Sequence, residues 1–183
     1  MDYYTLTDDI NFKDRWYLGD INIEDNWLFS YGKPLNTADF NNLRVEIDKR
    51  GKELDFTTTD GYEVPIISET FADQLVEFGE FIQLIPVSIP QTKLKYYILV
   101  LKCSIDCVDE GKSDFQKFEE GNDIRPDKAG EYKAINILKL DASRINAPIF
   151  RISKYDIEMV VSEEIKLKLE QSNMTGCRFK LAT

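Results

Sequence analysis

Residues 64–69 read VPIISE, and this stretch decides the fold because it joins a strand directly to a helix. Its β-branched run predicts a buried strand. Ser68 is a preferred N-cap, since a serine hydroxyl accepts a hydrogen bond from an amide of the first helical turn. Glu69 then adds negative charge where the helix dipole favours it. We therefore predict a strand that ends at Ser68 and a helix that follows at once.

A second stretch has the same organisation. Residues 157–164 read IEMVVSEE, which places Ser162 between a β-branched run and two glutamates. The spacing from Ser68 to Leu75 equals the spacing from Ser162 to Leu169, and the apolar residues between them predict one buried helix face in each copy. Neither copy has the G-x-S-x-G turn of a nucleophile elbow, so both serines are interpreted as structural caps. Whether the two units form a true internal repeat stays open.

The absence of histidine excludes many classes of function. The 183-residue chain has no Ser-His or Cys-His nucleophile pair, and it lacks the commonest metal ligand. Its three cysteines form no C-x-x-C pair, so the usual zinc sites are excluded as well. We expect free, reduced thiols, no catalytic residue, no metal site and no cofactor.

Net charge limits the kinds of partner. The formal charge is −10, and the acidic excess lies before residue 130. Such a surface repels phosphate backbones, so we expect no nucleic acid, and it attracts a basic macromolecule. Solubility alone is the other explanation of this charge. The amino terminus lacks a signal-peptide pattern, and the longest apolar run, residues 96–101, is too short to span a bilayer. We expect a cytoplasmic protein that does not bind membranes.

The remaining patterns predict more strands than helices. Alternation predicts a strand at 27–31 and a hairpin from 43–47 to 54–56. Residues 81–89 predict a strand at a sheet edge, because Pro86 cannot donate to a ladder. Residues 96–101 are apolar at nearly every position, which predicts burial on both faces. Two further strands are predicted at 132–141 and 149–153.

These elements predict an α+β fold in a single domain, with a mixed or mostly antiparallel sheet and few helices. Its 43% hydrophobic content is that of a folded globular protein. Residues 1–60 are interpreted as an aromatic, acidic, β-rich amino-terminal elaboration, and residues 61–183 as the core.

An acidic segment at 108–130 predicts a long loop that carries a short helix at 115–118. It lacks the ligand spacing of an EF-hand. A solvated loop is one interpretation. The other is a partner-binding edge, because loops on rigid scaffolds carry recognition. The candidate partner-binding residues are Asp109, Glu110, Asp114, Glu119, Glu120 and Asp123.

Several short segments follow one another in a fixed order. They are PIISE at 65–69, QLIPV at 83–87, YYIL at 96–99 with DC at 106–107, IFR at 149–151, VVSEE at 160–164 and TGCRF at 175–179. This succession resembles a bacterial family of predicted immunity proteins from polymorphic-toxin systems, catalogued as a domain of unknown function. The resemblance covers roughly residues 61–179 and leaves 1–60 without an anchor. It departs at 84–87, where an aromatic before the proline is more usual.

The resemblance implies a non-enzymatic cytoplasmic protein that binds a cognate toxin and blocks it by occlusion. It offers no catalytic residue to carry over, and its recurring positions map onto strands, caps and turns. Among them, Arg151 and Asp106 are expected to pair with each other or to bond to backbone. The recurring positions are Pro65, Ser68, Pro86, Tyr97, Asp106, Cys107, Phe150, Arg151, Ser162, Glu163, Gly176 and Phe179.

Two other classes of function stay open. One is a regulatory or scaffold binding module, dimeric through the aromatic amino-terminal part. The other is a carboxylate-based hydrolase, for which Asp106 with Asp109 or Glu110 is the only local pair of acids. Such an enzyme needs two acids facing each other in a cleft, one of them with a raised pKa.

Overall fold

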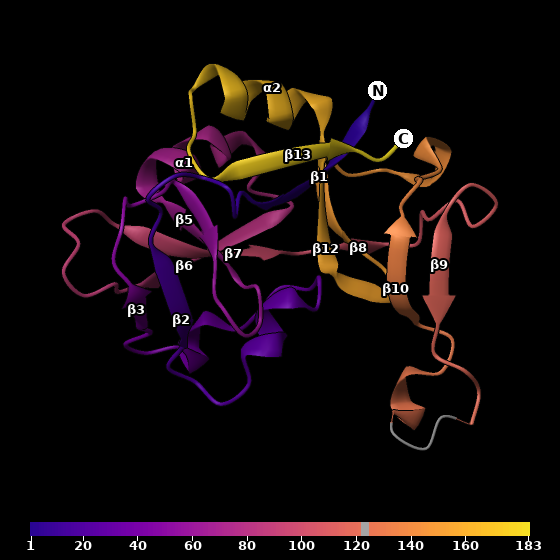
Figure 1. Ribbon diagram of the computed structural model, residues 1–183, viewed down its shortest axis with the longest axis horizontal. Coiled ribbons are helices and arrows are strands. Elements are labelled where there is room, and N and C mark those ends of the chain that lie inside the picture. The colour runs from indigo at the N-terminus through magenta and orange to yellow at the C-terminus, as the bar shows by residue number, and fades with distance from the viewer. Residues whose placement is uncertain (122–124) are drawn as a thin grey trace.

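The computed structural model describes residues 1–121 and 125–183 (Figure 1). In this part of the chain, antiparallel and mixed sheets accompany two α-helices, which confirms the predicted α+β domain. The strands are β1 (Tyr3–Asp8), β2 (Tyr17–Ile21), β3 (Val45–Lys49), β4 (Phe56–Thr58), β5 (Pro65–Ser68), β6 (Ile82–Val87), β7 (Tyr96–Leu101), β8 (Ser104–Ile105), β9 (Asp114–Lys117), β10 (Tyr132–Ile137), β11 (Ile149–Ile152), β12 (Tyr155–Ser162) and β13 (Cys177–Leu181). The helices are α1 (Glu69–Gln74) and α2 (Glu163–Gln171), with short 3₁₀ helices η1 (Asn26–Ser30), η2 (Thr37–Asp39), η3 (Val76–Phe78), η4 (Pro126–Lys128) and η5 (Ala142–Arg144).

Two larger sheets form the body of the molecule, with the strand orders β4-β5-β7-β6 and β13-β1-β12-β11-β8. The pairs β2-β3 and β9-β10 lie beside them on opposite sides in Figure 1. The helices α1 and α2 contact each other at the top of the same view. Each large sheet therefore has one α-helix packed beside it, and the two sheet–helix units contact each other through these helices.

Both serine caps are confirmed. The Ser68 hydroxyl accepts a hydrogen bond from the amide of Phe71 at 3.1 Å, and α1 begins at the next residue. The Ser162 hydroxyl accepts one from the amide of Ile165 at 3.4 Å, at the start of α2. Each serine satisfies an amide that the first turn of its helix leaves without an intrahelical partner.

The two units also pair in the same register. The capping serine of each unit lies opposite the first of two consecutive tyrosines, Tyr96-Tyr97 in β7 and Tyr3-Tyr4 in β1. The amide after each cap repeats a bond as well: Glu69 donates to Lys95 at 3.0 Å, and Glu163 donates to Asp2 at 2.9 Å. These matching bonds make β1 the counterpart of β7.

The strand orders extend the correspondence. The order β4-β5-β7-β6 matches β11-β12-β1-β13, and both units run as hairpin, helix and outer strand. In the first unit the central strand, β7, comes last in sequence, whereas in the second unit it is β1, from the start of the chain. The two units therefore share one topology, with the central strand of the second unit supplied by the start of the chain.

Asp55 ties the two units together. One of its carboxylate oxygens accepts a bond from the Ser68 hydroxyl at 2.8 Å, and the other accepts bonds from the Thr175 amide at 3.0 Å and hydroxyl at 2.7 Å. The next residue, Gly176, has φ +87°, and a Cβ there would lie 2.0 Å from the carbonyl oxygen of Phe56. Only glycine fits this seam, which explains the Thr-Gly pair before β13.

Residues 1–60, predicted as an elaboration, supply strands to both large sheets. β1 lies between β13 and β12, and β4 pairs with β5 in a hairpin that crosses residue 60. The rest of this segment, with β2, β3 and η1, packs on the outer face of the β4-β5-β7-β6 sheet through buried residues that include Trp16 and Phe29.

The predictions for β6 and β7 are confirmed. β6, which contains Pro86, is an edge strand. β7 lies between β5 and β6 and is buried on both faces: Leu99 and Leu101 contact the core shared with the helices, whereas Ile98 and Val100 contact the outer core.

Three local predictions are wrong. Residues 26–30 form the 3₁₀ helix η1 and no strand, because the buried Asn26 side chain bonds the amide and the carbonyl of Ile21 at 3.0 Å each. The expected hairpin from 43–47 to 54–56 does not form, since β3 pairs with β2 and β4 pairs with β5. The helix expected at 115–118 is the strand β9, paired with β10.

Removal of either serine hydroxyl tests whether Ser68 and Ser162 stabilise the starts of α1 and α2. Ser162→Ala should lower the free energy of unfolding by about 1 kcal/mol, the usual cost of a lost N-cap. Ser68→Ala should cost about 2 kcal/mol, because it also removes the bond to Asp55. Urea denaturation measures both values, with Ser88→Ala at an exposed serine as the control. Equal stability of Ser68→Ala and Ser88→Ala would contradict the assignment.

Circular permutation tests this shared topology. A linker of about six residues from Thr183 to Met1 spans a short gap, because the Ala182 amide already bonds the Tyr3 carbonyl at 2.9 Å. Opening this chain between Gln91 and Thr92 should exchange the roles of the two units and retain the circular dichroism spectrum and one cooperative unfolding transition. Opening inside β7, between Ile98 and Leu99, should prevent folding. An unfolded first permutant would refute the equivalence of β1 and β7.

Candidate functional site

The acids of the predicted partner-binding segment lie on the β9–β10 hairpin and the turn before it. Asp109 forms an ion pair with Lys112 at 2.9 Å, and Glu110 forms one with Lys117 at 2.6 Å. Glu110 also accepts a bond from the Tyr132 hydroxyl at 2.7 Å. These bonds fix the hairpin locally and leave the carboxylates at the surface.

The other members are distributed along the same hairpin. Asp114 accepts a bond from the Asn136 side chain at 3.0 Å, across β9 and β10. Glu119 and Glu120 are exposed after the end of β9. Asp123 lies outside the described residues. The structure therefore places most of the predicted acids on one projecting hairpin, and their role in partner binding stays a prediction.

The acids proposed for a hydrolase lack the environment of a general acid. The bond from Lys112 lowers the pKa of Asp109, and the bonds from Lys117 and Tyr132 lower the pKa of Glu110. A general acid needs the opposite shift. Asp106 is exposed and lies 3.8 Å from Lys154.

The expected pairing of Arg151 with Asp106 is wrong, and the alternative, a bond to backbone, is confirmed. Arg151 is buried in β11, and its Nη1 donates to the Ile157 carbonyl at 3.0 Å. Asp106 follows β8 at the surface instead and faces Lys154. Arg151 of the IFR segment is thus an interior residue, whereas Asp106 is exposed.

A cleft between η1 and the β10–β12 side of the molecule gathers exposed aromatic residues. We call it the aromatic cleft; its volume is about 400 Å³. Trp27 and Tyr31 form one wall, with 44% and 42% of their surface exposed, and Ile157 of β12 is 44% exposed. Large apolar side chains seldom stay this exposed together without a binding role. Its lining is Trp27, Ser30, Tyr31, Phe118, Arg125, Asp127, Lys128, Glu131, Tyr132, Lys133, Lys154, Tyr155, Asp156 and Ile157.

Local structure holds the aromatic wall in place. The side chain of Asp25 accepts a bond from the Trp27 amide at 3.1 Å and caps η1. The Trp27 ring meets Tyr62 edge-on, with ring centroids 5.2 Å apart. Phe29, between the two exposed aromatics, is fully buried and anchors the turn. Contacts within the chain therefore support the Trp27 side of this wall.

Ion pairs balance much of the charge at the cleft. Asp127 pairs with Arg125 at 2.9 Å, and Glu131 pairs with Lys128 at 3.2 Å. Asp156 also lines the cleft, and burial together with the nearby charge of Glu131 raises the pKa of its carboxyl. The rim thus offers both signs of charge around an apolar centre, which is the usual anatomy of a protein interface.

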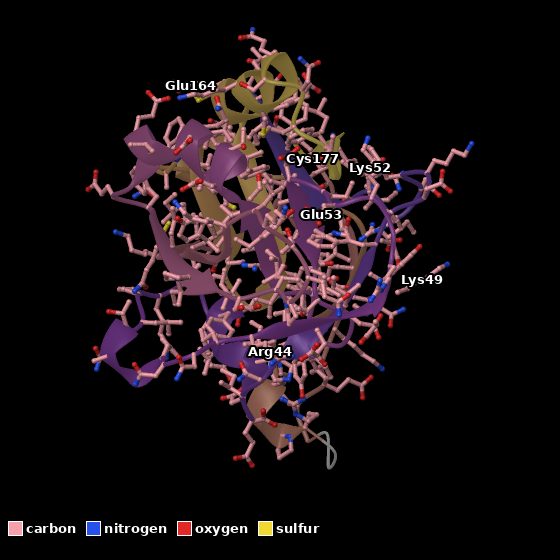
Figure 2. The ribbon with its side chains drawn as sticks, turned by 90° about the vertical axis from the view of Figure 1, so that its left-hand side faces the viewer. Arg44, Lys49, Lys52, Glu53, Glu164 and Cys177 are labelled. Atoms are coloured by element: carbon pink, nitrogen blue, oxygen red, sulfur yellow. The ribbon has the colours of Figure 1, made fainter. Side chains whose placement is uncertain are left out.

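Three basic residues, Arg44, Lys49 and Lys52, lie apart from one another on the face that Figure 2 shows. Arg44 pairs with Glu46 at 2.6 Å, and the ammonium of Lys52 lies 4.9 Å from the centre of the Phe12 ring.

The three thiols are free, and burial makes them poorly reactive. Cys103, Cys107 and Cys177 form no disulfide within the described residues. Burial raises the pKa of Cys107 to about 12, and it also raises the pKa of Cys177. A thiol with a raised pKa is a poor nucleophile at neutral pH.

Comparison with known proteins finds no family model that matches the chain and no curated protein that matches it. Within the described ranges, no helix has both the length and the apolar character that crossing a bilayer requires.

The aromatic cleft could not be predicted from the sequence, because its walls come from segments far apart in the chain. The exposed aromatics of η1 were visible as a cluster, but alternation placed Trp27, Phe29 and Tyr31 on one strand face. In the structure Phe29 of η1 is buried, whereas Trp27 of η1 and Tyr31, the residue after it, are exposed.

Fluorescence quenching tests whether the cleft is open. Trp16 is 1% exposed and Trp27 is 44% exposed, and the chain has no other tryptophan. Acrylamide should therefore quench mainly the fluorescence that Trp27 emits. Trp27→Phe should leave a blue-shifted emission that resists the quencher, whereas Trp16→Phe should leave a readily quenched one. Equal quenching of the two variants would contradict an open cleft.

Proposed function

We propose that this protein is a cytoplasmic, non-enzymatic inhibitor of the immunity type, which binds a cognate protein toxin and blocks it by occlusion. The observation that carries the proposal is the convergence of exposed Trp27, Tyr31 and Ile157 on one cleft. Tryptophan and tyrosine are enriched among the residues that contribute most to protein–protein affinity. The sequence resemblance to predicted immunity proteins supports the same class.

Charge supports a basic partner. The chain carries a formal charge of −10, and the exposed Glu119 lines a hollow that shares Phe118 and Lys133 with the aromatic cleft. Complementary charge mainly accelerates encounter, whereas the buried aromatic contacts supply most of the affinity. We propose that the toxin is steered by the acidic surface and anchored in the aromatic cleft. We expect neither nucleic acid nor membrane as a partner.

Co-expression with the toxin encoded next to this gene tests the function. The inhibitor should rescue growth and co-purify with the toxin. Trp27→Ala should weaken the complex roughly thirtyfold, which corresponds to about 2 kcal/mol for an anchor residue. Leu94→Ala, at an exposed apolar residue outside the cleft, is the matched control and should change affinity less than twofold.

The outcomes separate the function from the site. Failure of both rescue and co-purification would refute an inhibitor of this toxin. Co-purification that Trp27→Ala does not weaken would refute the aromatic cleft as its site. Concentration-dependent dimerisation of the free protein that Trp27→Ala abolishes would favour the regulatory or scaffold module, with a second copy of this chain in the cleft.

A further inference from the structure

β13 is the outermost strand of its sheet, and one of its two edges is open. The strand order is β13-β1-β12-β11-β8, so β1 occupies the other edge. In an antiparallel pair, every second residue directs its N–H and C=O toward the neighbouring strand. The Ala182 amide bonds the Tyr3 carbonyl at 2.9 Å, which fixes the phase of this alternation. Phe179 and Leu181 therefore direct their backbone groups away from β1.

These outward groups have no partner within residues 1–121 and 125–183. In these ranges β13 forms a ladder with β1 alone, and no other group bonds to the backbone of Phe179 or Leu181. The edge strand β6 differs, because it contains Pro86, which has no N–H to offer. β13 has neither a proline nor a bulge, so its edge keeps the regular geometry that accepts another strand.

A hollow runs along this open edge. Its volume is about 390 Å³, and every residue from 178 to 182 lines it. Successive side chains of a strand point to opposite faces, so a hollow that touches consecutive residues reaches the backbone between them. Ile135 and Asn136 of β10 line the hollow as well, but β10 pairs with β9 and not with β13. The backbone edge is therefore accessible from the hollow.

Two cations flank the open edge on one face of β13. Arg178 and Lys180 are exposed and line the hollow, and neither has an ion-pair partner in the part of the chain that the structure describes. Their register places them opposite Thr7 and Thr5, whose side chains share this face of the sheet. Among the described residues, Glu158 is the acid that lines the hollow, and it accepts a hydrogen bond from the Thr5 hydroxyl. The hollow thus combines two cations with one carboxylate, in a chain whose formal charge is −10.

The opposite face of β13, toward the helices, is apolar. Leu181 is 46% exposed, and Phe179 is partly buried against the core that α1 and α2 share. A strand added to the edge directs its side chains alternately to the two faces. One set would lie beside Arg178 and Lys180, and the other beside Phe179 and Leu181. Cross-strand pairs of opposite charge and of apolar residues are stabilising, so the edge fits a segment that alternates acidic and apolar residues.

We propose that the open edge of β13 binds an extended segment of a partner protein by strand addition, and that this segment alternates acidic and apolar residues. Backbone bonds to Phe179 and Leu181 supply affinity for any extended chain, whereas Arg178 and Lys180 select acidic side chains. The same cations disfavour the β13 edge of a second copy, because like charges directly opposite each other are destabilising. The site does not depend on the inhibitor function proposed above.

Amide hydrogen exchange, followed by NMR, tests the site directly. In the free protein the amides of Phe179 and Leu181 should exchange quickly, whereas those of Arg178 and Lys180, which face β1, should exchange slowly. The peptide acetyl-Thr-Val-Glu-Val-Glu-Val-Thr-amide should slow the exchange of Phe179 and Leu181 about tenfold. The same peptide with lysine in place of glutamate should slow it much less.

Three results would overturn the proposal. The first is exchange at Phe179 and Leu181 that neither peptide slows, and the second is equal slowing by both peptides. The third is slow exchange of these amides in the free protein that depends on protein concentration, because a second copy of this chain would then occupy the edge.

Two charge reversals make the test specific. Lys180→Glu should weaken binding of the glutamate peptide about tenfold, because it replaces an attractive cross-strand pair by a repulsive one. The lysine peptide should bind this variant more tightly than it binds the unaltered protein. Lys93→Glu makes the same change at an exposed lysine outside the hollow and is the matched control. Equal affinities of Lys180→Glu and Lys93→Glu for the glutamate peptide would overturn the proposal.

Discussion

One apolar core, shared by two copies of a strand–helix unit, is the constraint on which the rest of the structure depends. Phe71 and Leu75 from the first unit meet Ile165 and Leu169 from the second, and both sheets contribute side chains to the same cluster. Burial of each such side chain stabilises the fold by about 1.5–3 kcal/mol. Neither unit covers this apolar surface alone, so each needs the other in order to fold.

Ser68, Thr175 and Asp55 give this core its alignment. A hydrophobic interface has no fixed register, whereas the bonds from Ser68 and Thr175 to Asp55 lock one relative position of the two units. Gly176 permits the close approach that these bonds require. Ser68 of the first Ser-Glu pair and the Thr175-Gly176 pair are thus parts of one joint.

Local patterns predicted the elements whose structure is decided locally. Ser68 and Ser162 could be identified as caps because the bond reaches only three residues ahead. Pro86 placed its strand at an edge through its missing amide hydrogen. The pairing of β2 with β3 could not be predicted, because alternation shows that a strand exists but not which strand it joins.

The candidate sites show the same limit more strongly. The acids of 108–130 were visible as a run in the sequence, and most of them lie on one hairpin. The aromatic cleft combines η1 with β10 and β12. This site arises only where distant segments meet. The repeated motifs describe the scaffold, and this proposed binding surface lies outside them.

Native-state hydrogen exchange of β1 tests the central claim that the amino-terminal strand completes the second unit. If β1 is the counterpart of β7, its hydrogen-bonded amides should exchange only through global unfolding, with the same free energy as those of β7. Exchange of the β1 amides at a clearly lower free energy, while β12 and β7 stay protected, would contradict it. The amino terminus would then be a detachable arm, and the shared core would belong to the remaining strands alone.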